Sequence, residues 1–492
     1  MKRSPLAVLV ETQERHQTDI DPAAEPSGAC LPRIPEGNGR PSFNQRLRHP
    51  FDLLRTQLAA QLDEQSPRGS IAALDGVRAI ACLFVISFHI SLMTHAQHLW
   101  SYESVPFISA LMLDGGSGVM LFFVLSGFLL FLPYAQALLF ARSWPSARQF
   151  YLRRALRILP GYYVSLVLLV LLSRPDFLHP RHWIDLLLFV VLLMDSTPGA
   201  NHQINGPFWT LAVEWQFYLL LPLIALAIYW VVRRVRTAWR VGAIVGCLLL
   251  LLGWGWGTTA LGDYFMRQPT ATVLVPRSVL NVALWCTYGM GGKYLQDFAA
   301  GMLASLAYVA LRTPGTVARY GQRMRRLSPW LWGSGLVVLL VLALGHISHD
   351  FSHVHWQVLD GIFQTWGWSN VPGYALGFSL CLLGILFGSS RVTAVFRWAP
   401  LRWLGMISYA LYIWHLPLLA AFDTHVAPSL VGWHPLVAYG LYWVWVALIV
   451  IPFSLAVYLL VERPGMRLSA RLRFHPRSDS AAAEFATGRA RK

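Results

Sequence analysis

Charge is scarce in this chain of 492 residues, because only 13% of them are Asp, Glu, Lys or Arg. An average soluble domain carries about a quarter charged residues. Hydrophobic residues make up 55% of the sequence, and the mean hydropathy is +0.47. This balance excludes a pair of soluble domains and a disordered chain. The composition instead predicts an all-α, polytopic integral membrane bundle.

Cysteine is also scarce, and no two cysteines form a CxxC pair. The five are Cys30, Cys82, Cys247, Cys286 and Cys381. Their scatter predicts buried small hydrophobes and neither a disulfide framework nor a metal site.

Four histidines at 346, 349, 353 and 355 have spacings that could serve a metal. With no cysteine and only two carboxylates nearby, an ordinary polar loop is favoured, and we expect no metal.

Positive charge exceeds negative charge, with 40 Lys and Arg against 24 Asp and Glu, a formal net charge of +16. Such an excess can indicate nucleic-acid binding. In a membrane protein it is expected without any nucleic acid, because Lys and Arg collect in cytoplasmic loops. We therefore expect the lipid bilayer as a partner and no nucleic acid.

Eleven apolar segments follow a polar stretch that has no signal peptide. They lie near 73–95, 115–140, 155–173, 183–194, 208–232, 240–257, 294–311, 329–345, 372–389, 403–422 and 437–461. Segment 183–194 is shorter than the roughly 20 residues that a spanning helix needs, and placing all the strongly basic loops inside requires that it does not cross. Ten spanning helices with both termini cytoplasmic are predicted.

One outer loop, 258–293, departs from the charge pattern, since it carries Arg267, Arg277 and Lys293. It also holds a second apolar stretch too short to span, Val279–Met290. The predicted organisation is a polar, partly disordered cytoplasmic tail at 1–70, a membrane domain at 71–465 and a basic cytoplasmic tail at 466–492.

The first apolar segment carries Arg78 and, eleven positions later, His89. Eleven helical residues make about three whole turns, so both side chains share a face, roughly 16 Å apart along the axis. Ionisable residues inside a bilayer are costly, so a functional role is the default hypothesis. The alternative is that Arg78 anchors the helix end while His89 bonds to a neighbouring helix.

Three further stretches place polar groups beside or inside apolar segments. Ser126 and Gly127 lie in an aromatic-rich segment, where they serve helix packing or line a slot for a ligand chain. Arg154 and Arg157 share a helix face, and they either anchor the helix or form a fork for a phosphorylated ligand. Glu214 pairs with a hydroxyl or a Trp N–H, or it has a functional partner such as a histidine or a sugar hydroxyl.

Two late stretches complete the pattern. The aromatic-rich run Leu404–Pro417 could belong to the interfacial belt, and Glu462 is expected to pair locally with Arg463.

These stretches, in this order, resemble the membrane-bound acyltransferase-3 family over residues 72–464. The features are Leu74–Arg78 with His89, Gly118–Phe128, Arg153–Pro160, Trp209–Pro222, Ile407–Pro417 and Glu462–Pro464. Trp215 stands where relatives often have a second acidic residue. Many relatives also carry a C-terminal secreted esterase-like domain, which is absent from this sequence, so the last transfer is expected to fall to the membrane part or to a separate extracytoplasmic partner.

The resemblance implies a multi-pass protein of the bacterial inner membrane that transfers an acyl group, commonly acetyl, from cytoplasmic acetyl-CoA to a carbohydrate hydroxyl at the outer side. It implies no permanently bound cofactor, with acyl-CoA as donor substrate. Arg78 and His89 correspond to the family's essential pair, and Arg154 and Arg157 to its paired arginines.

On that basis Arg78, Arg154 and Arg157 are expected to bind the coenzyme A phosphates, and His89 to act as general base. Glu214 is expected to orient His89, and Ser126 to support the oxyanion. A covalent acyl-histidine, or Ser126 as nucleophile, stays open. Other acyl groups, a lipid or antibiotic acceptor, and a secondary transporter with a buried proton relay are the alternatives.

Overall fold

The computed structural model describes residues 72–102, 105–140, 142–272, 275–350, 357 and 370–472. The predictions for the tail at 1–70 and for the residues after 472 lie outside this part of the chain. The prediction about the four outer histidines concerns side chains that are not described either, and it stays a prediction.

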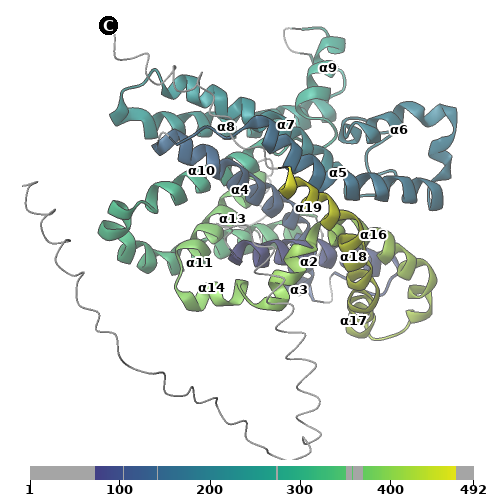
Figure 1. Ribbon diagram of the computed structural model, residues 1–492. Coiled ribbons are helices and arrows are strands. Elements are labelled where there is room, and N and C mark those ends of the chain that lie inside the picture. Colours follow the sequence, from purple (N-terminus) through teal and green to yellow (C-terminus); the bar gives the residue numbers. More distant parts are fainter. Residues whose placement is uncertain are drawn as a thin grey trace, which may run out of the picture. The chain divides into compact units, whose positions relative to one another are not determined.

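The described residues form helices and contain no β-strand, so the predicted all-α fold class is confirmed (Figure 1). In chain order the α-helices are α2 (Ala72–Ala96), α3 (Pro106–Leu113), α4 (Gly118–Phe140), α5 (Ala147–Leu172), α6 (Trp183–Val190), α7 (Phe208–Val232), α8 (Arg240–Arg267), α9 (Arg277–Thr287), α10 (Leu295–Leu311), α11 (Pro314–Asp350), α13 (Asn370–Phe387), α14 (Ser390–Phe396), α15 (Ala399–Met406), α16 (Ser408–His425), α17 (Pro435–Trp445), α18 (Ile451–Val457) and α19 (Arg463–Arg471).

Each of the eleven predicted apolar segments falls on one or more of these helices. Among the described residues, seven helical segments are long and apolar enough to span a membrane. The pair α15 and α16, bent by 74°, forms an eighth candidate, and α10 and α13 are shorter apolar helices. The chain is therefore a multi-pass membrane protein, while the number of ten crossings stays a prediction.

The two apolar stretches that were expected not to span are short helices. Helix α6 has eight residues, and α9 has eleven residues, none of them buried. Cys286 on α9 is exposed, contrary to the expectation of a buried thiol, whereas Cys82 and Cys381 are buried.

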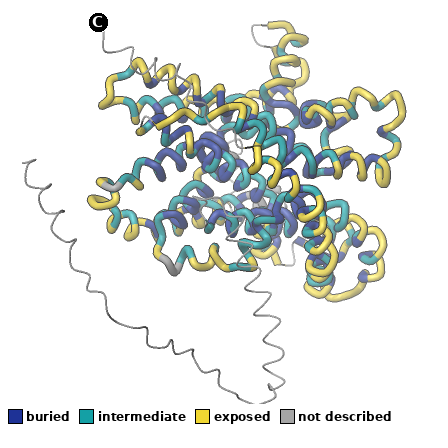
Figure 2. The backbone as a smooth tube through the Cα atoms, in the orientation of Figure 1, coloured by how far each residue is buried: buried dark blue, intermediate teal, exposed yellow. Residues whose placement is uncertain are grey.

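The side chains that face outward from the bundle are largely apolar. On α8, Leu250 and Trp254 are 76% and 62% exposed. Figure 2 shows exposed stretches along the outer helices and buried stretches in the interior. In water such an apolar surface would be costly, but lipid tails solvate it, as expected for a bundle that lies in a bilayer.

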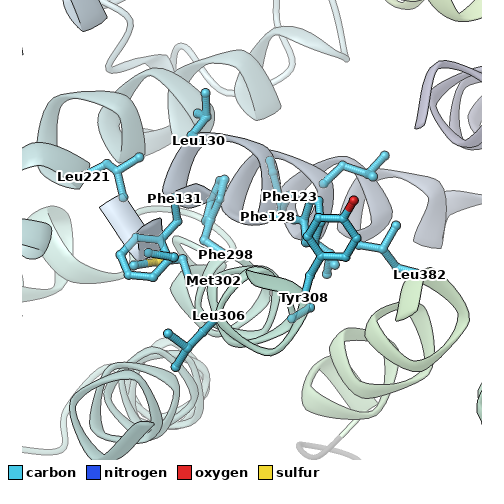
Figure 3. Close-up of a cluster of buried hydrophobic side chains, with 14 of the residues drawn as sticks. Phe123, Phe128, Leu130, Phe131, Leu221, Phe298, Met302, Leu306, Tyr308 and Leu382 are labelled. Carbon is cyan, nitrogen blue, oxygen red and sulfur yellow. The ribbon is translucent and has the colours of Figure 1, made fainter. Parts of the chain in front are cut away.

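The largest buried cluster forms where α4 packs along α10 (Figure 3). Phe123 and Phe128 of α4 pack against Phe298 and Tyr308 of α10, and the ring centroids of Phe123 and Phe298 are 4.8 Å apart. Close approach of two membrane helices requires small residues where the backbones meet. That requirement identifies two glycines as the contact points.

Gly127 of α4 and Gly301 of α10 leave no room for a side chain. A Cβ on Gly127 would lie 2.1 Å from the Phe298 carbonyl oxygen, and one on Gly301 would lie 2.0 Å from the Val124 carbonyl oxygen. Because both obstacles are backbone atoms, neither can move away without separating the helices.

Another close approach of two helices fixes the position of α15 and α16 against α2. A Cβ on Gly405 of α15 would lie 1.8 Å from the Asp75 carbonyl oxygen of α2, and Cys82 Sγ of α2 lies 3.8 Å from the Ser408 carbonyl oxygen. The start of α16 is thereby held against α2. This contact brings His89 and His415, which are far apart in the sequence, to one place.

We predict that Gly301→Ala lowers the thermal unfolding midpoint, because the added methyl group forces α10 away from α4. Overpacking of this kind costs about 1–3 kcal/mol. Gly246→Ala on α8 is the matched control, since a Cβ there meets nothing within 4 Å. Equal midpoints for the two variants would contradict the close packing of α4 against α10.

Candidate active site

Polar side chains inside the bundle form two groups. The first, which we call the arginine cluster, consists of Arg78, Arg154 and Arg157. The second is the histidine pair, His89 and His415. Helix α2 contributes to both groups, because Arg78 and His89 lie on it eleven residues apart, roughly 16 Å along its axis.

The arginine cluster is assembled from two helices, as the sequence predicted. Helix α2 supplies Arg78, and α5 supplies Arg154 and Arg157 one turn apart. Arg78 interacts electrostatically with both Arg154 and Arg157. Its Nη1 lies 3.3 Å from Asp75 Oδ1.

Glu214 is the carboxylate that faces this cluster. It interacts electrostatically with Arg78 and Arg154, and its Oε1 accepts hydrogen bonds from the Ser126 hydroxyl and the Tyr218 hydroxyl. Two hydroxyl donors and two guanidinium groups thus surround this carboxyl group. Glu214 therefore compensates part of the buried positive charge.

Among the described residues, Glu214 and His89 form no hydrogen bond with each other. The described hydrogen bonds of His89 go to Val85 and His415, and those of Glu214 go to Ser126 and Tyr218. That Glu214 orients His89 stays a prediction. The Ser126 hydroxyl hydrogen is already donated to Glu214, so an oxyanion role for Ser126 stays a prediction.

A second carboxylate joins the cluster from the end of the chain. Glu462 lies in a π-helical turn, Tyr458–Glu462, is only 3% exposed and interacts electrostatically with Arg157. The side chain lies against α5, where a Cβ on Gly161 would be 3.6 Å from Glu462 Cγ, and the local pair with Arg463 stays a prediction. π-Helical turns occur frequently at functional sites, because they redirect a side chain that a regular helix would point elsewhere.

One donor in the arginine cluster has no partner. Arg154 Nε is buried, and it makes no hydrogen bond to any described residue. An unsatisfied buried donor is uncommon, because it costs about 1–3 kcal/mol. The group is thus suited to bind an anionic or carbonyl oxygen of a ligand.

The histidine pair joins α2 to α16. His415 Nε2 lies 3.2 Å from His89 Nδ1, and the two ring centroids are 4.9 Å apart. His89 Nδ1 also lies 2.9 Å from the Val85 carbonyl oxygen, and His415 Nδ1 lies 2.7 Å from the Tyr412 carbonyl oxygen.

This network assigns the ring protons. A carbonyl oxygen only accepts, so His415 Nδ1 carries a hydrogen, and in the neutral ring its Nε2 is an acceptor. His89 Nδ1 therefore faces two acceptors, the Val85 oxygen and His415 Nε2, and must carry a hydrogen itself. It follows that Nε2 of neutral His89 has a free lone pair, which is the requirement for a general base.

A third histidine approaches from the loop before α7. His202 is exposed and interacts electrostatically with His89. Partial burial lowers the pKa of His202, and a hydrogen bond with the Gly206 backbone opposes that shift. The neutral form is therefore favoured near neutral pH, and it places no extra positive charge beside His89.

One residue lies between the two groups. This residue is Tyr412. Its carbonyl oxygen lies within hydrogen-bond distance of His415 Nδ1, and its hydroxyl oxygen lies 2.8 Å from Thr210 Oγ1. The Tyr412 side chain also interacts electrostatically with Glu214. The arginine cluster and the histidine pair are thus parts of one buried polar system. Sequence reasoning had not selected Tyr218, His202 or His415, although His415 stood in the aromatic-rich run already noted.

Together, the fold and these groups define a polytopic membrane protein with a buried cationic cluster and a histidine whose lone pair is free. A sequence model of an acyltransferase domain, that of the acyltransferase-3 family, matches residues 71–461. The chain therefore belongs to this family, as the resemblance had indicated.

Two curated proteins illustrate what the chain is similar to. It is 24% identical to the peptidoglycan O-acetyltransferase OatA of Listeria monocytogenes in an alignment 387 residues long that covers 72% of this chain and 50% of that protein. It is 23% identical to the putative peptidoglycan O-acetyltransferase YrhL of Bacillus subtilis in an alignment 371 residues long that covers 71% of this chain and 48% of that protein. The chain thus matches about half the length of these relatives. No solved structure matches it.

We predict that His415→Ala lowers acyl-transfer kcat by about tenfold to a hundredfold, because His89 loses one of the two acceptors that fix its tautomer and the ring that positions it. His415→Gln should recover part of the loss, since the glutamine oxygen can replace the lost acceptor. The measurement is kcat and its pH profile, with the thermal midpoint as a control for folding. Equal activity of the Ala and Gln variants would contradict the positioning role.

Proposed function

We propose that this protein is a membrane O-acetyltransferase of the bacterial inner membrane. In this proposal it moves an acetyl group from acetyl-CoA to a hydroxyl group of a glycan, with peptidoglycan as the first candidate acceptor because both relatives are named for it. The observation that carries the proposal is the histidine pair, which leaves His89 Nε2 free to accept a proton inside an acyltransferase-family bundle.

The arginine cluster supports acetyl-CoA as the donor. Coenzyme A carries several phosphate groups, and guanidinium groups bind phosphate in a planar, bidentate geometry. Arg154 offers an unused donor at Nε. The roughly 16 Å from Arg78 to His89 along α2 is a suitable reach for the flexible pantetheine arm.

The chemistry needs one base and no further reactant. His89 Nε2 takes the proton of the acceptor hydroxyl as its oxygen attacks the thioester carbonyl carbon. The carbon–oxygen bond forms, the carbon–sulfur bond breaks, and the coenzyme A thiolate leaves with the proton from His89. The products are the acetyl ester and free coenzyme A.

The two polar groups also support a direction across the membrane. Arg78 lies near the start of α2, and Arg154 near the start of α5, which follow basic stretches expected inside. His89 lies further along α2, toward loops that carry no Lys or Arg at 96–114 and 195–207. In this arrangement the donor binds from the cytoplasm and the acceptor from the outer side.

We predict that His89→Ala and His89→Gln lose at least about a hundredfold in acetyl transfer, the usual contribution of a general base. The assay is O-acetylation of glycan by the purified protein in nanodiscs supplied with labelled acetyl-CoA. His425→Ala is the matched control, because His425 is exposed at the end of α16. Parent-like transfer by His89→Gln would contradict the role of His89 as base.

We also predict that Arg154→Ala weakens acetyl-CoA binding by about tenfold or more, since a charge-assisted bond to phosphate is lost. Equilibrium binding of labelled acetyl-CoA measures this. Arg153→Ala is the control on the same helix, because Arg153 is exposed. Equal acetyl-CoA binding by the two variants would show that the arginine cluster is not the donor site. If the protein were a transporter, neither variant nor the parent would bind acetyl-CoA.

A further inference from the structure

Four aromatic side chains lie in a row that begins at His202, which interacts electrostatically with His89, and the proposed chemistry does not use them. We call His202, Trp209, Tyr294 and Phe123 the aromatic row. The ring centroids of His202 and Trp209 are 6.1 Å apart, those of Trp209 and Tyr294 5.5 Å, and those of Tyr294 and Phe123 5.3 Å. The row joins the loop before α7 to the start of α10 and to α4.

We propose that the aromatic row is the acceptor subsite, on which a pyranose ring of the glycan stacks while one of its hydroxyl groups is presented to His89. The proposal rests on the function proposed above and adds the residues that recognise the acceptor. Sugar rings have an apolar C–H face that packs on flat aromatic side chains, and a few polar groups around such a surface give orientation.

The row is graded from exposed to buried. His202 is exposed, Trp209 and Tyr294 are partly buried, and Phe123 is 2% exposed. Phe123 belongs to the core cluster, and Trp209 and Tyr294 pack against it, so the core anchors the buried end of the row and leaves the His202 end for a ligand. The exposed end belongs to His202, the residue that interacts electrostatically with His89.

The backbone at two members of the row is strained. His202 has φ 59° and Tyr294 has φ 51°, in the left-handed region that non-glycine residues rarely occupy. Only two other non-glycine residues in the described ranges share it, His98 and Leu192. Such strain costs about 1–3 kcal/mol per residue and concentrates at ligand sites, where it aims a side chain.

The two segments that carry the strained residues are tied together. Lys293, next to Tyr294, forms a buried ion pair with Asp195, and the Met290 backbone N–H donates to the Asp195 carbonyl oxygen at 2.9 Å. Gln216 Nε2 of α7 also donates to Asp195 Oδ1 at 2.9 Å. The spacing between Trp209 and Tyr294 is therefore fixed before any ligand binds.

The loop that carries His202 is also fixed against the histidine pair. Asn205 Nδ2 donates to the Ile413 carbonyl oxygen at 2.9 Å, two residues before His415. A Cβ on Gly206 would lie 2.8 Å from a methyl carbon of Leu416. This contact and the Asn205 hydrogen bond hold the loop against α16, so that His202 lies at the edge of the histidine pair.

The test compares Trp209→Ala with Trp209→Phe in nanodiscs, with a soluble peptidoglycan disaccharide as acceptor and labelled acetyl-CoA as donor. Trp209→Ala should raise the KM for the disaccharide about tenfold, with a smaller effect on kcat, and Trp209→Phe should recover most of it because a ring is retained. Acetyl-CoA binding should equal that of the parent. Trp254→Ala on the outer face of α8 is the matched control, since Trp254 is 62% exposed.

A second variant tests the strained end of the row. His202→Asn removes the ring but tolerates the left-handed backbone, so it should raise the KM for the disaccharide without lowering the thermal midpoint. An unchanged KM in both Trp209→Ala and His202→Asn, with a parent that acetylates the disaccharide, would overturn the acceptor subsite alone. A parent that binds acetyl-CoA but acetylates no glycan would overturn the proposed glycan acceptor and the subsite together.

Discussion

The electrostatic contact between Glu214 and the buried arginines is the interaction on which the rest of the interior depends. On insertion scales a single arginine at the centre of a membrane helix costs about 2.5–3.5 kcal/mol, so Arg78, Arg154 and Arg157 need compensation within the bundle. Glu214 faces two of them, and Glu462 faces Arg157. Ser126 of α4 then fixes Glu214 of α7, and the adjacent Gly127 lets α4 lie directly on α10.

The same packing separates two tasks along α2. One end of the helix carries a cluster of fixed positive charge, suited to a phosphorylated donor. Further along, a neutral histidine whose proton position is set by its neighbours is suited to accept a proton. Tyr412 connects them, because its carbonyl oxygen holds His415 and its side chain lies near Glu214. A thioester that is anchored at the arginines could therefore be attacked beside His89.

The sequence predicted the helical membrane fold and the assembly of the three arginines, because apolar runs and helical spacing are local properties. It did not predict the partner of His89, since His415 lies 326 residues away in the sequence. The position of His415 next to His89 depends on the bend between α15 and α16. It left the partner of Glu214 open between a hydroxyl and a histidine, because helical position alone does not tell which neighbouring helix a side chain faces. It also missed the buried position of Glu462, which requires a π-helical turn.

The central claim is that one buried polar system takes the acetyl group from a donor on the arginine side and delivers it to an acceptor on the histidine side. The most direct measurement uses proteoliposomes of uniform orientation, with labelled acetyl-CoA outside and the peptidoglycan disaccharide sealed inside, and then the reverse. The account predicts labelled disaccharide in only the arrangement that places acetyl-CoA at the arginine side. Label transfer solely when donor and acceptor share one compartment would contradict it.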